Sequence, residues 1–180
     1  DAPVLLAVGS LSPEKRLDRL LRLAAVLRAG HPQLYVWIVG DGPLLEPLQR
    51  LAAELQVQDR VQFWGTQANI GDFLCAADLL ALTSDTEGMP GVLLEAGYTA
   101  TPVVATRVGG VAECVRNGET GILVDPADEG ALAQAAAGLL ADGERRRQMG
   151  EAARRWVAAH FTIERVAGQY LSFYESLMAL

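Results

Sequence analysis

Short apolar runs alternate along the chain with longer segments in which apolar residues recur every three to four positions. A short apolar run is typical of a buried strand, and the longer spacing is typical of a helix with one buried face. The runs predict six strands, at residues 4–8, 35–39, 61–63, 79–82, 103–106 and 122–124. Strands that alternate with helical segments predict an α/β fold with a parallel sheet.

The segments between these strands predict helices that cover both faces of the sheet. The first helix is predicted to have Ser12 as its N-cap, Pro13 as its first residue and a buried stripe that begins at Leu17. Further helices are predicted through Leu48, Leu51, Ala52 and Leu55, at 70–76 and at 91–98. From Asp128 onward only helix is predicted, with breaks near 142–143 and 161–162. We therefore predict a single doubly wound α/β domain over residues 1–180, with a helical C-terminal tail.

The composition limits the kinds of molecule that the chain is expected to bind. Lys plus Arg is 15 and Asp plus Glu is 22 in 180 residues, so the net charge is 15 − 22 = −7. This negative field disfavours binding to nucleic acid or to an anionic membrane. No apolar run reaches the roughly 18 residues that a membrane span needs, and two cysteines with two distant histidines favour neither a disulfide framework nor a zinc site. The chain begins with Asp1 rather than Met, and we expect the natural protein to be longer.

Candidate chemistry gathers where the predicted strands end, which is where open parallel sheets bind ligands. Gly9 and Ser10 follow the first strand, and Lys15 falls in the first turn of the predicted helix. A lysine beside free helix N–H groups favours an anion site, although a solvated lysine beside Glu14 is the alternative. A turn at Gly40 to Gly42 follows the second strand and lets backbone approach a flat ligand closely, although alone it is simply a turn.

Residues 84–96 are the most informative stretch. Pro90 suits the first position of a helix, which leaves the next N–H groups unpaired and directed at the preceding loop. Glu87 lies just before that helix. Glu95 lies within it among apolar residues, where a carboxylate needs hydrogen-bond donors such as adjacent sugar hydroxyls. The alternative for either glutamate is an internal salt bridge or a cap.

The sequence lacks several common motifs for nucleotide binding and for nucleophilic catalysis. The chain has no GxGxxG fingerprint, no phosphate-binding GxxxxGK[ST] loop, and no histidine beside either cysteine. The glycine pair Gly109-Gly110, with Glu113 just beyond it, is interpreted as a plain turn between a strand and a helix.

Taken together, these segments resemble the donor-binding half of a GT-B glycosyltransferase, in the retaining group called glycosyltransferase family 4. The resemblance covers nearly the whole chain and rests on segments in the family's order, namely 8–15, 40–43, 61–65, 87–96 with its E-x7-E pair, 102–106, 109–113 and 117–124. It implies a Rossmann-like domain that is one half of a GT-B fold.

The resemblance also implies roles. Lys15 would clamp the donor diphosphate and Glu87 would touch the donor sugar, as the catalytic pair, while Glu95 would hold the ribose hydroxyls. Further donor-binding positions are implied at Gly9, Ser10, Gly40, Gly42, Gly65, Thr66, Met89, Pro90, Gly91 and Val92. The implied reaction transfers a hexosyl unit from a UDP-, GDP- or ADP-sugar to an acceptor hydroxyl, in the cytoplasm, without a metal or another cofactor.

Two departures from the family's pattern qualify this hypothesis. Ser10 stands where the family usually has Arg, so half of the expected cationic clamp is missing, with Arg16 and Arg107 as possible substitutes. The N-terminal acceptor-binding half is also missing, and any peripheral membrane contact is expected only through that half. We therefore expect the isolated chain to bind a donor but not to turn it over.

Two alternatives remain open. One is a non-catalytic α/β module of the same fold that has lost its ligand, which Ser10 favours and the retained Lys15, Glu87 and Glu95 oppose. A receiver-type or flavin-binding domain is disfavoured, because the first strand is followed by neither an acidic cluster nor a phosphate loop. The C-terminal stripe of Tyr170, Phe173, Tyr174 and Leu177 is expected either to cross to the missing half or to pack on its own domain.

Overall fold

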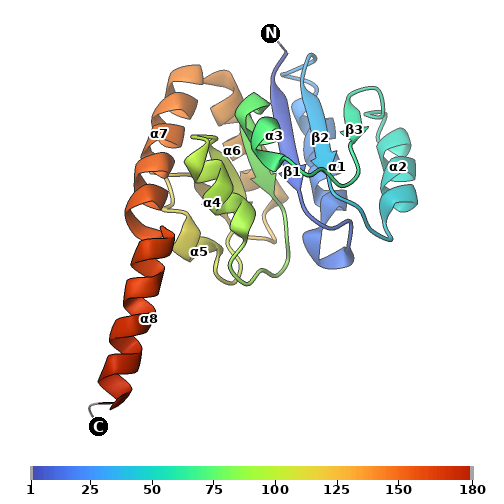
Figure 1. Ribbon diagram of the computed structural model, residues 1–180. Helices are drawn as coiled ribbons and strands as arrows, with labels where there is room; N and C mark the ends of the chain where they lie inside the picture. Colours follow the sequence, from blue (N-terminus) through green and yellow to red (C-terminus); the bar gives the residue numbers. More distant parts are fainter. Residues whose placement is uncertain (1, 179–180) are drawn as a thin grey trace.

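The computed structural model describes residues 2–178, which contain a six-stranded parallel sheet with strand order β3-β2-β1-β4-β5-β6 (Figure 1). The strands are β1 (Val4–Val8), β2 (Tyr35–Val39), β3 (Val61–Phe63), β4 (Leu79–Leu82), β5 (Val103–Thr106) and β6 (Ile122–Val124). All six have the predicted bounds, which confirms the interpretation of the apolar runs. The order reverses between β1 and β4, which is the topological switch point of a doubly wound sheet.

Helices cover both faces of the sheet, as predicted. They are α1 (Leu17–Leu27), α2 (Leu45–Glu54), α3 (Ile70–Ala76), α4 (Gly91–Tyr98), α5 (Val111–Cys114), α6 (Glu129–Ala141), α7 (Gly143–His160) and α8 (Ile163–Met178). The helix breaks near 142–143 and 161–162 are confirmed. The four-residue helix α5 follows the Gly109-Gly110 turn, as expected for a turn between a strand and a helix, although its bounds were not predicted because a single turn has no apolar period to recognise.

The alternation of side chains along the strands builds two separate cores. On one face, Leu5, Val36 and their neighbours pack under α1, α2 and α6. On the other face, Leu6, Leu80 and their neighbours pack under α3, α4 and α5. Successive strand residues point to opposite faces, so a strand that is apolar throughout fills both cores and is fixed in register by both.

The segment after β1 differs from the prediction. Pro13 begins a short 3₁₀ turn, η1 (Pro13–Lys15), and α1 begins only at Leu17 because Arg16 adopts a left-handed conformation with φ of 48°. The Thr83 hydroxyl holds this kink by donating to the carbonyl oxygens of Lys15 and Arg16, 3.1 Å away in each case. Lys15 therefore does not lie in the first turn of an α-helix, and Ser12 makes no side-chain cap there.

Helix α8 extends away from the body of the molecule (Figure 1). None of its described residues is buried, and Tyr170, Phe173, Tyr174 and Leu177 are all exposed. The expectation that this stripe packs on its own domain is therefore wrong for the structure as described.

Candidate functional site

Lys15 and Glu87 meet at the switch point of the sheet. The Lys15 ammonium lies 2.8 Å and 3.0 Å from the two carboxylate oxygens of Glu87, and the Ser84 hydroxyl donates to the first of these oxygens at 2.6 Å. The Glu87 side chain is 7% exposed and that of Lys15 is 25% exposed. Lys15 is thus part of a shielded ion pair with a residue 72 positions away, rather than a solvated lysine beside Glu14.

Hydrogen bonds between their loops hold this pair together. The backbone N–H of Asp85 donates to the Glu14 carbonyl at 2.8 Å. Arg19 is buried in α1 and donates to the Thr83 carbonyl and to Asp85. These contacts join the β1–α1 loop and the start of α1 to the β4–α4 loop that carries Glu87.

Of the two proposed substitutes for the missing cation, Arg16 is already paired with acidic side chains. It is bound to Asp18 and Asp85, at 3.0 Å and 2.8 Å, and its hydrogen bond lowers the pKa of Asp85. Arg107 is exposed. Ser10 itself shares a hydrogen bond of 2.8 Å with Ser12. Arg16 therefore does not offer a free cation beside Ser10.

Gly40 and Gly42 serve packing between loops. A Cβ atom at Gly40 would lie 1.9 Å from the Gly9 carbonyl oxygen, and one at Gly42 would lie 2.6 Å from that of Leu11. Gly40 has a φ of 136° and donates its N–H to Gly65 at 2.8 Å. The close approach that these glycines allow is thus to neighbouring backbone, and the flat ligand inferred from the turn is not needed to explain them.

The loop after β3 carries Gly65 and Thr66, the two positions expected to border a base. Gly65 has a φ of 64° and open space around its Cβ direction, and Thr66 is exposed. Trp64 packs edge-on against Trp37 and Phe73, with ring centroids 5.6 Å and 5.2 Å away. Such pairs favour a fixed geometry, so the loop starts from a rigid aromatic cluster.

Gly109 and Gly110 support Glu87, which the sequence interpretation missed. A Cβ atom at Gly109 would lie 1.7 Å from the Glu87 carbonyl oxygen, and one at Gly110 would lie 2.3 Å from that of Gly88. The N–H of Gly110 also donates to Gly88 at 2.8 Å. The two glycines shortly after the end of β5 were visible in the sequence. Their contacts with Glu87 and Gly88, 22 residues earlier, were not.

Glu95 is exposed, so its carboxylate is not buried among the apolar residues that flank it in the sequence. Helix α4 buries Leu93, Ala96 and Gly97 against the sheet and α7, which leaves Glu95 on another side. There it borders a cavity of about 400 Å³ between α3 and α4. The other lining residues are Ala68, Ile70, Gly71, Leu74, Tyr98 and Thr99.

Helix α4 begins at Gly91, with Pro90 as its N-cap residue rather than its first helical residue. Gly91 and Val92 therefore present the first N–H groups of the helix, while that of Leu93 bonds to Pro90 at 3.1 Å. This helix terminus follows the Glu87 loop directly, as the sequence predicted.

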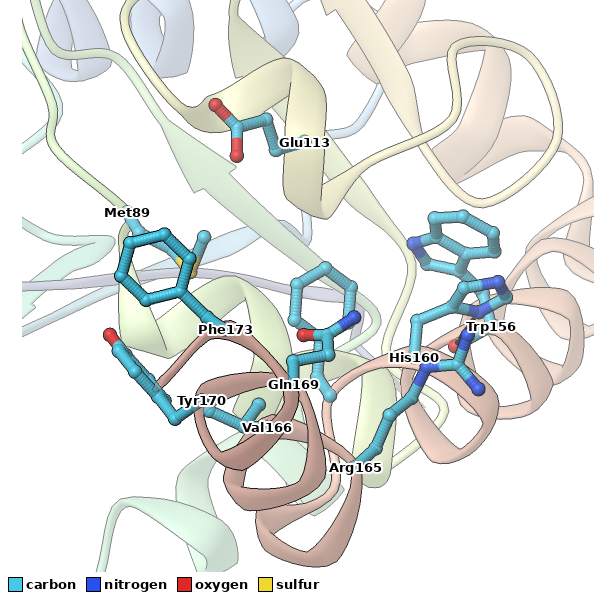
Figure 2. Close-up of a pocket in the computed structure, with 10 residues that line it drawn as sticks. Met89, Glu113, Trp156, His160, Arg165, Val166, Gln169, Tyr170 and Phe173 are labelled. Carbon is cyan, nitrogen blue, oxygen red and sulfur yellow. Dashed lines mark hydrogen bonds between the residues drawn. The ribbon is translucent and has the colours of Figure 1, made fainter. Parts of the chain in front are cut away.

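Met89 lies elsewhere. It is 54% exposed and borders a second cavity, of about 620 Å³, together with Glu113, Trp156 and the inner side of α8 (Figure 2). Figure 2 draws Met89 and Phe173 among the residues that line this cavity. The structure thus does not place Met89 in the cavity that Glu95 borders.

Among residues 2–178, no helix is long and apolar enough to cross a membrane. No group of three or more His, Cys, Asp or Glu side chains in the same range is arranged to hold a metal ion.

The six-stranded parallel sheet, with helices on both faces and a helical C-terminal tail, is the doubly wound architecture that the sequence predicted. The chain belongs to the family described as glycosyl transferases group 1, whose profile matches residues 1–156. The resemblance inferred from the sequence is confirmed.

Its relatives are glycosyltransferases. The chain is 40% identical, over 87% of its length and 43% of the relative, to the GDP-mannose-dependent alpha-(1-6)-phosphatidylinositol monomannoside mannosyltransferase of Mycolicibacterium smegmatis. It is 39% identical, over 78% of its length and 37% of the relative, to the N-acetyl-alpha-D-glucosaminyl L-malate synthase of Bacillus anthracis.

Among solved structures, Anabaena HepE in complex with UDP-glucose superposes with a TM-score of 0.87 at 28% identity, over 98% of this chain and 49% of that one. The sucrose-phosphate synthase of Thermosynechococcus elongatus superposes with a TM-score of 0.89 at 32% identity, over 99% and 46%. The chain thus spans about half the length, or less, of the relatives that it matches.

Proposed function

We propose that the chain is the donor-binding domain of a retaining glycosyltransferase that transfers a hexosyl unit from a nucleoside-diphosphate sugar to an acceptor hydroxyl. The observation that carries this proposal is the Lys15–Glu87 pair at the carboxyl ends of β1 and β4. Relatives named for GDP-mannose and solved with UDP-glucose support the same donor class.

Lys15 is suited to a diphosphate without leaving Glu87. An ammonium has three N–H donors, and the contacts at 2.8 Å and 3.0 Å to Glu87 use at most two of them. The remaining donor and the N-terminus of α4 place positive charge where a diphosphate gains charge as it departs. Because these groups supply that charge, we propose that no metal takes part.

Glu95 is suited to a ribose. Its exposed carboxylate accepts from two adjacent hydroxyls without first losing an internal partner, and the cavity of about 400 Å³ beside it has room for a nucleoside. The loop with Gly65 and Thr66 leads into the wall of this cavity at Ala68. The base, ribose and diphosphate would then lie along one rim, from the β3–α3 loop to Lys15.

The acceptor site is assigned to a half of the protein outside this chain, since the relatives are about twice as long. We propose that the isolated chain binds donor but does not turn it over. The exposed stripe of α8 would then pack against that other half.

Calorimetric titration of the chain with UDP, GDP and ADP tests the proposal. We expect one nucleotide to bind more tightly than millimolar, with the same affinity in the presence of EDTA. Glu95→Ala should weaken that nucleotide about tenfold or more, because hydrogen bonds to a charged group are the stronger kind. Glu54→Ala, an exposed glutamate of α2, is the control and should change nothing. Millimolar or weaker binding of all three, with no effect of Glu95→Ala, rejects the site.

A non-catalytic module that has lost its ligand is the second candidate, favoured by Ser10 and by the pairing of Arg16 with Asp18 and Asp85. Ser10→Arg discriminates between the two. A large gain in nucleotide affinity on restoring the arginine indicates a decayed site, whereas a small change in a chain that already binds indicates a working one.

A further inference from the structure

Ser84 is a buried polar residue that none of the roles above uses. It lies two residues beyond β4 and is 1% exposed. Its hydroxyl donates to Oε1 of Glu87 at 2.6 Å, and its carbonyl accepts from the hydroxyl of Thr106 on β5 at 2.6 Å. Ser84 is therefore fixed on one side to the neighbouring strand and on the other side to the glutamate.

The two donors on Glu87 differ in their freedom. Lys15 has a long, flexible side chain that is one quarter exposed, and it is the group expected to engage an incoming diphosphate. Ser84 has one rotatable side-chain bond and no exposed surface to move into. When Lys15 turns its remaining donor toward a diphosphate while still paired with Glu87, the Ser84 hydrogen bond limits how far the Glu87 carboxylate can move with it.

The hydrogen bond from Ser84 also determines which carboxylate oxygen of Glu87 accepts fewer hydrogen bonds within the protein. Oε1 of Glu87 accepts from both Lys15 and Ser84, whereas Oε2 accepts only from Lys15, at 3.0 Å. A carboxylate has about four lone-pair sites over its two oxygens. Oε2 thus retains the larger capacity to accept from a ligand hydroxyl.

We propose that Ser84 is a positioning residue that aims Oε2 of Glu87 at a hydroxyl of the donor sugar. The proposal rests on the donor-binding function proposed above. Ser84 acts through Glu87 and touches neither the sugar nor the diphosphate.

A double-mutant cycle without ligand tests the first half of this proposal. The stability of wild type, Ser84→Ala, Glu87→Ala and the double variant is measured by urea denaturation. Ser84→Ala should raise the unfolding equilibrium constant about tenfold in the wild-type background, since it removes a hydrogen bond to a charge, and have little effect beside Ala at position 87. Additive effects would show that Ser84 does not act on Glu87.

Sugar recognition tests the second half. The readout is the ratio of the Kd of the nucleoside diphosphate to that of its sugar nucleotide, which isolates the contribution of the sugar. We expect Ser84→Ala to lower this ratio about fivefold or more while the Kd of the diphosphate stays within twofold, in line with a lost charged hydrogen bond. Ser84→Thr, which keeps the hydroxyl, should restore the ratio.

Thr120→Val is the matched control, because it removes a buried hydroxyl that bonds only to the Arg116 backbone. It should destabilise the chain without changing the ratio. Thr106→Val releases the Ser84 carbonyl and should lower the ratio about threefold, which gives a second test if Ser84→Ala does not fold.

The outcomes separate the inference from the proposed function. A chain that binds no nucleotide overturns both, even if the cycle shows coupling, since the hydrogen bond then serves stability alone. If the wild-type chain binds nucleotide but Ser84→Ala loses affinity for the diphosphate and for the sugar nucleotide by the same factor, only the role of Ser84 is overturned.

Discussion

Lys15 places a positive charge at the proposed donor site, in a chain whose net charge is −7. Its removal acts in two ways, since it deprives a diphosphate of a cation and leaves the 7%-exposed Glu87 carboxylate with Ser84 as its remaining side-chain donor. We expect Lys15→Met to weaken nucleoside diphosphate binding at least tenfold and to destabilise the fold by about 1–3 kcal/mol.

Lys15→Arg is the control for this prediction. It keeps the charge but replaces a compact ammonium with a planar fork, so it should retain most of the stability and only part of the affinity. Calorimetry and urea denaturation measure the two effects separately. Unchanged diphosphate affinity in Lys15→Met would contradict the placement of the diphosphate at Lys15.

Asp18 makes stability depend on pH at the start of α1. Burial opposes its ionisation, but hydrogen bonds from Arg16 and Arg22 outweigh that effect and lower its pKa from 3.8 to about 2. A carboxyl whose pKa is lower in the folded state stabilises the fold above its unfolded pKa and loses that contribution as pH falls through the folded value.

The stability difference between wild type and Asp18→Asn should therefore be constant from pH 7 to about pH 5. It should shrink as pH falls from about 4 toward 2, the window between the two pKa values. Urea denaturation across this range measures it, with the exposed Asp125→Asn variant as a reference. A difference that grows on acidification would contradict the assigned sign.

At the scale of elements, α7 packs so closely against Ala100 that Gly150 has no room for a side chain. A Cβ atom at Gly150 would lie 1.9 Å from the carbonyl oxygen of Ala100, just beyond α4. Alanine usually favours a helix interior by about 1 kcal/mol over glycine, but here the added methyl forces backbone apart. We expect Gly150→Ala to destabilise the chain by about 1–3 kcal/mol.

Gly138→Ala in α6 is the matched control, because nothing lies within 4 Å of its added Cβ atom. That change should stabilise the chain by about 0.5–1 kcal/mol. Thermal and urea unfolding of both variants measure the contrast. If both substitutions stabilise, α7 does not lie against Ala100 as described.

The elements themselves were predictable because local pattern decides them. Each strand is a short apolar run that fills both cores, so its bounds follow from residues next to one another in the sequence. The start of α1 was not predictable, since the left-handed Arg16 is held by the distant Thr83. The exposure of Glu95 was missed for a related reason, because apolar neighbours along a helix do not show which side is buried.

The site was predictable only in part, because its contacts join distant segments. The strand order places β1 beside β4, and only then do Lys15 and Glu87 meet across 72 positions. The support of Glu87 by Gly109 depends on β5 lying next to β4. The sequence therefore indicated the residues proposed to bind the donor, while the contacts that position Lys15 and Glu87 became visible only in the fold.

At the scale of the whole molecule, α8 exposes large apolar side chains to solvent. Its exposed residues include Tyr170, Phe173, Tyr174 and Leu177, and the chain covers about half the length of its relatives. An exposed apolar patch of this kind marks an interaction surface, and in isolation it favours association. Because none of the described residues of α8 is buried, the helix contributes little to the stability of the sheet.

A chain that ends at Thr162 should therefore melt within about 3 °C of the full 180 residues, since a loss of 1 kcal/mol shifts Tm by about that amount at this size. It should also stay monomeric at concentrations where the full chain associates, as measured by analytical ultracentrifugation. The double variant Phe173→Ser and Leu177→Ser should behave like the truncation while keeping the helix. A large drop in Tm on truncation would instead mean that α8 packs on the sheet domain in solution.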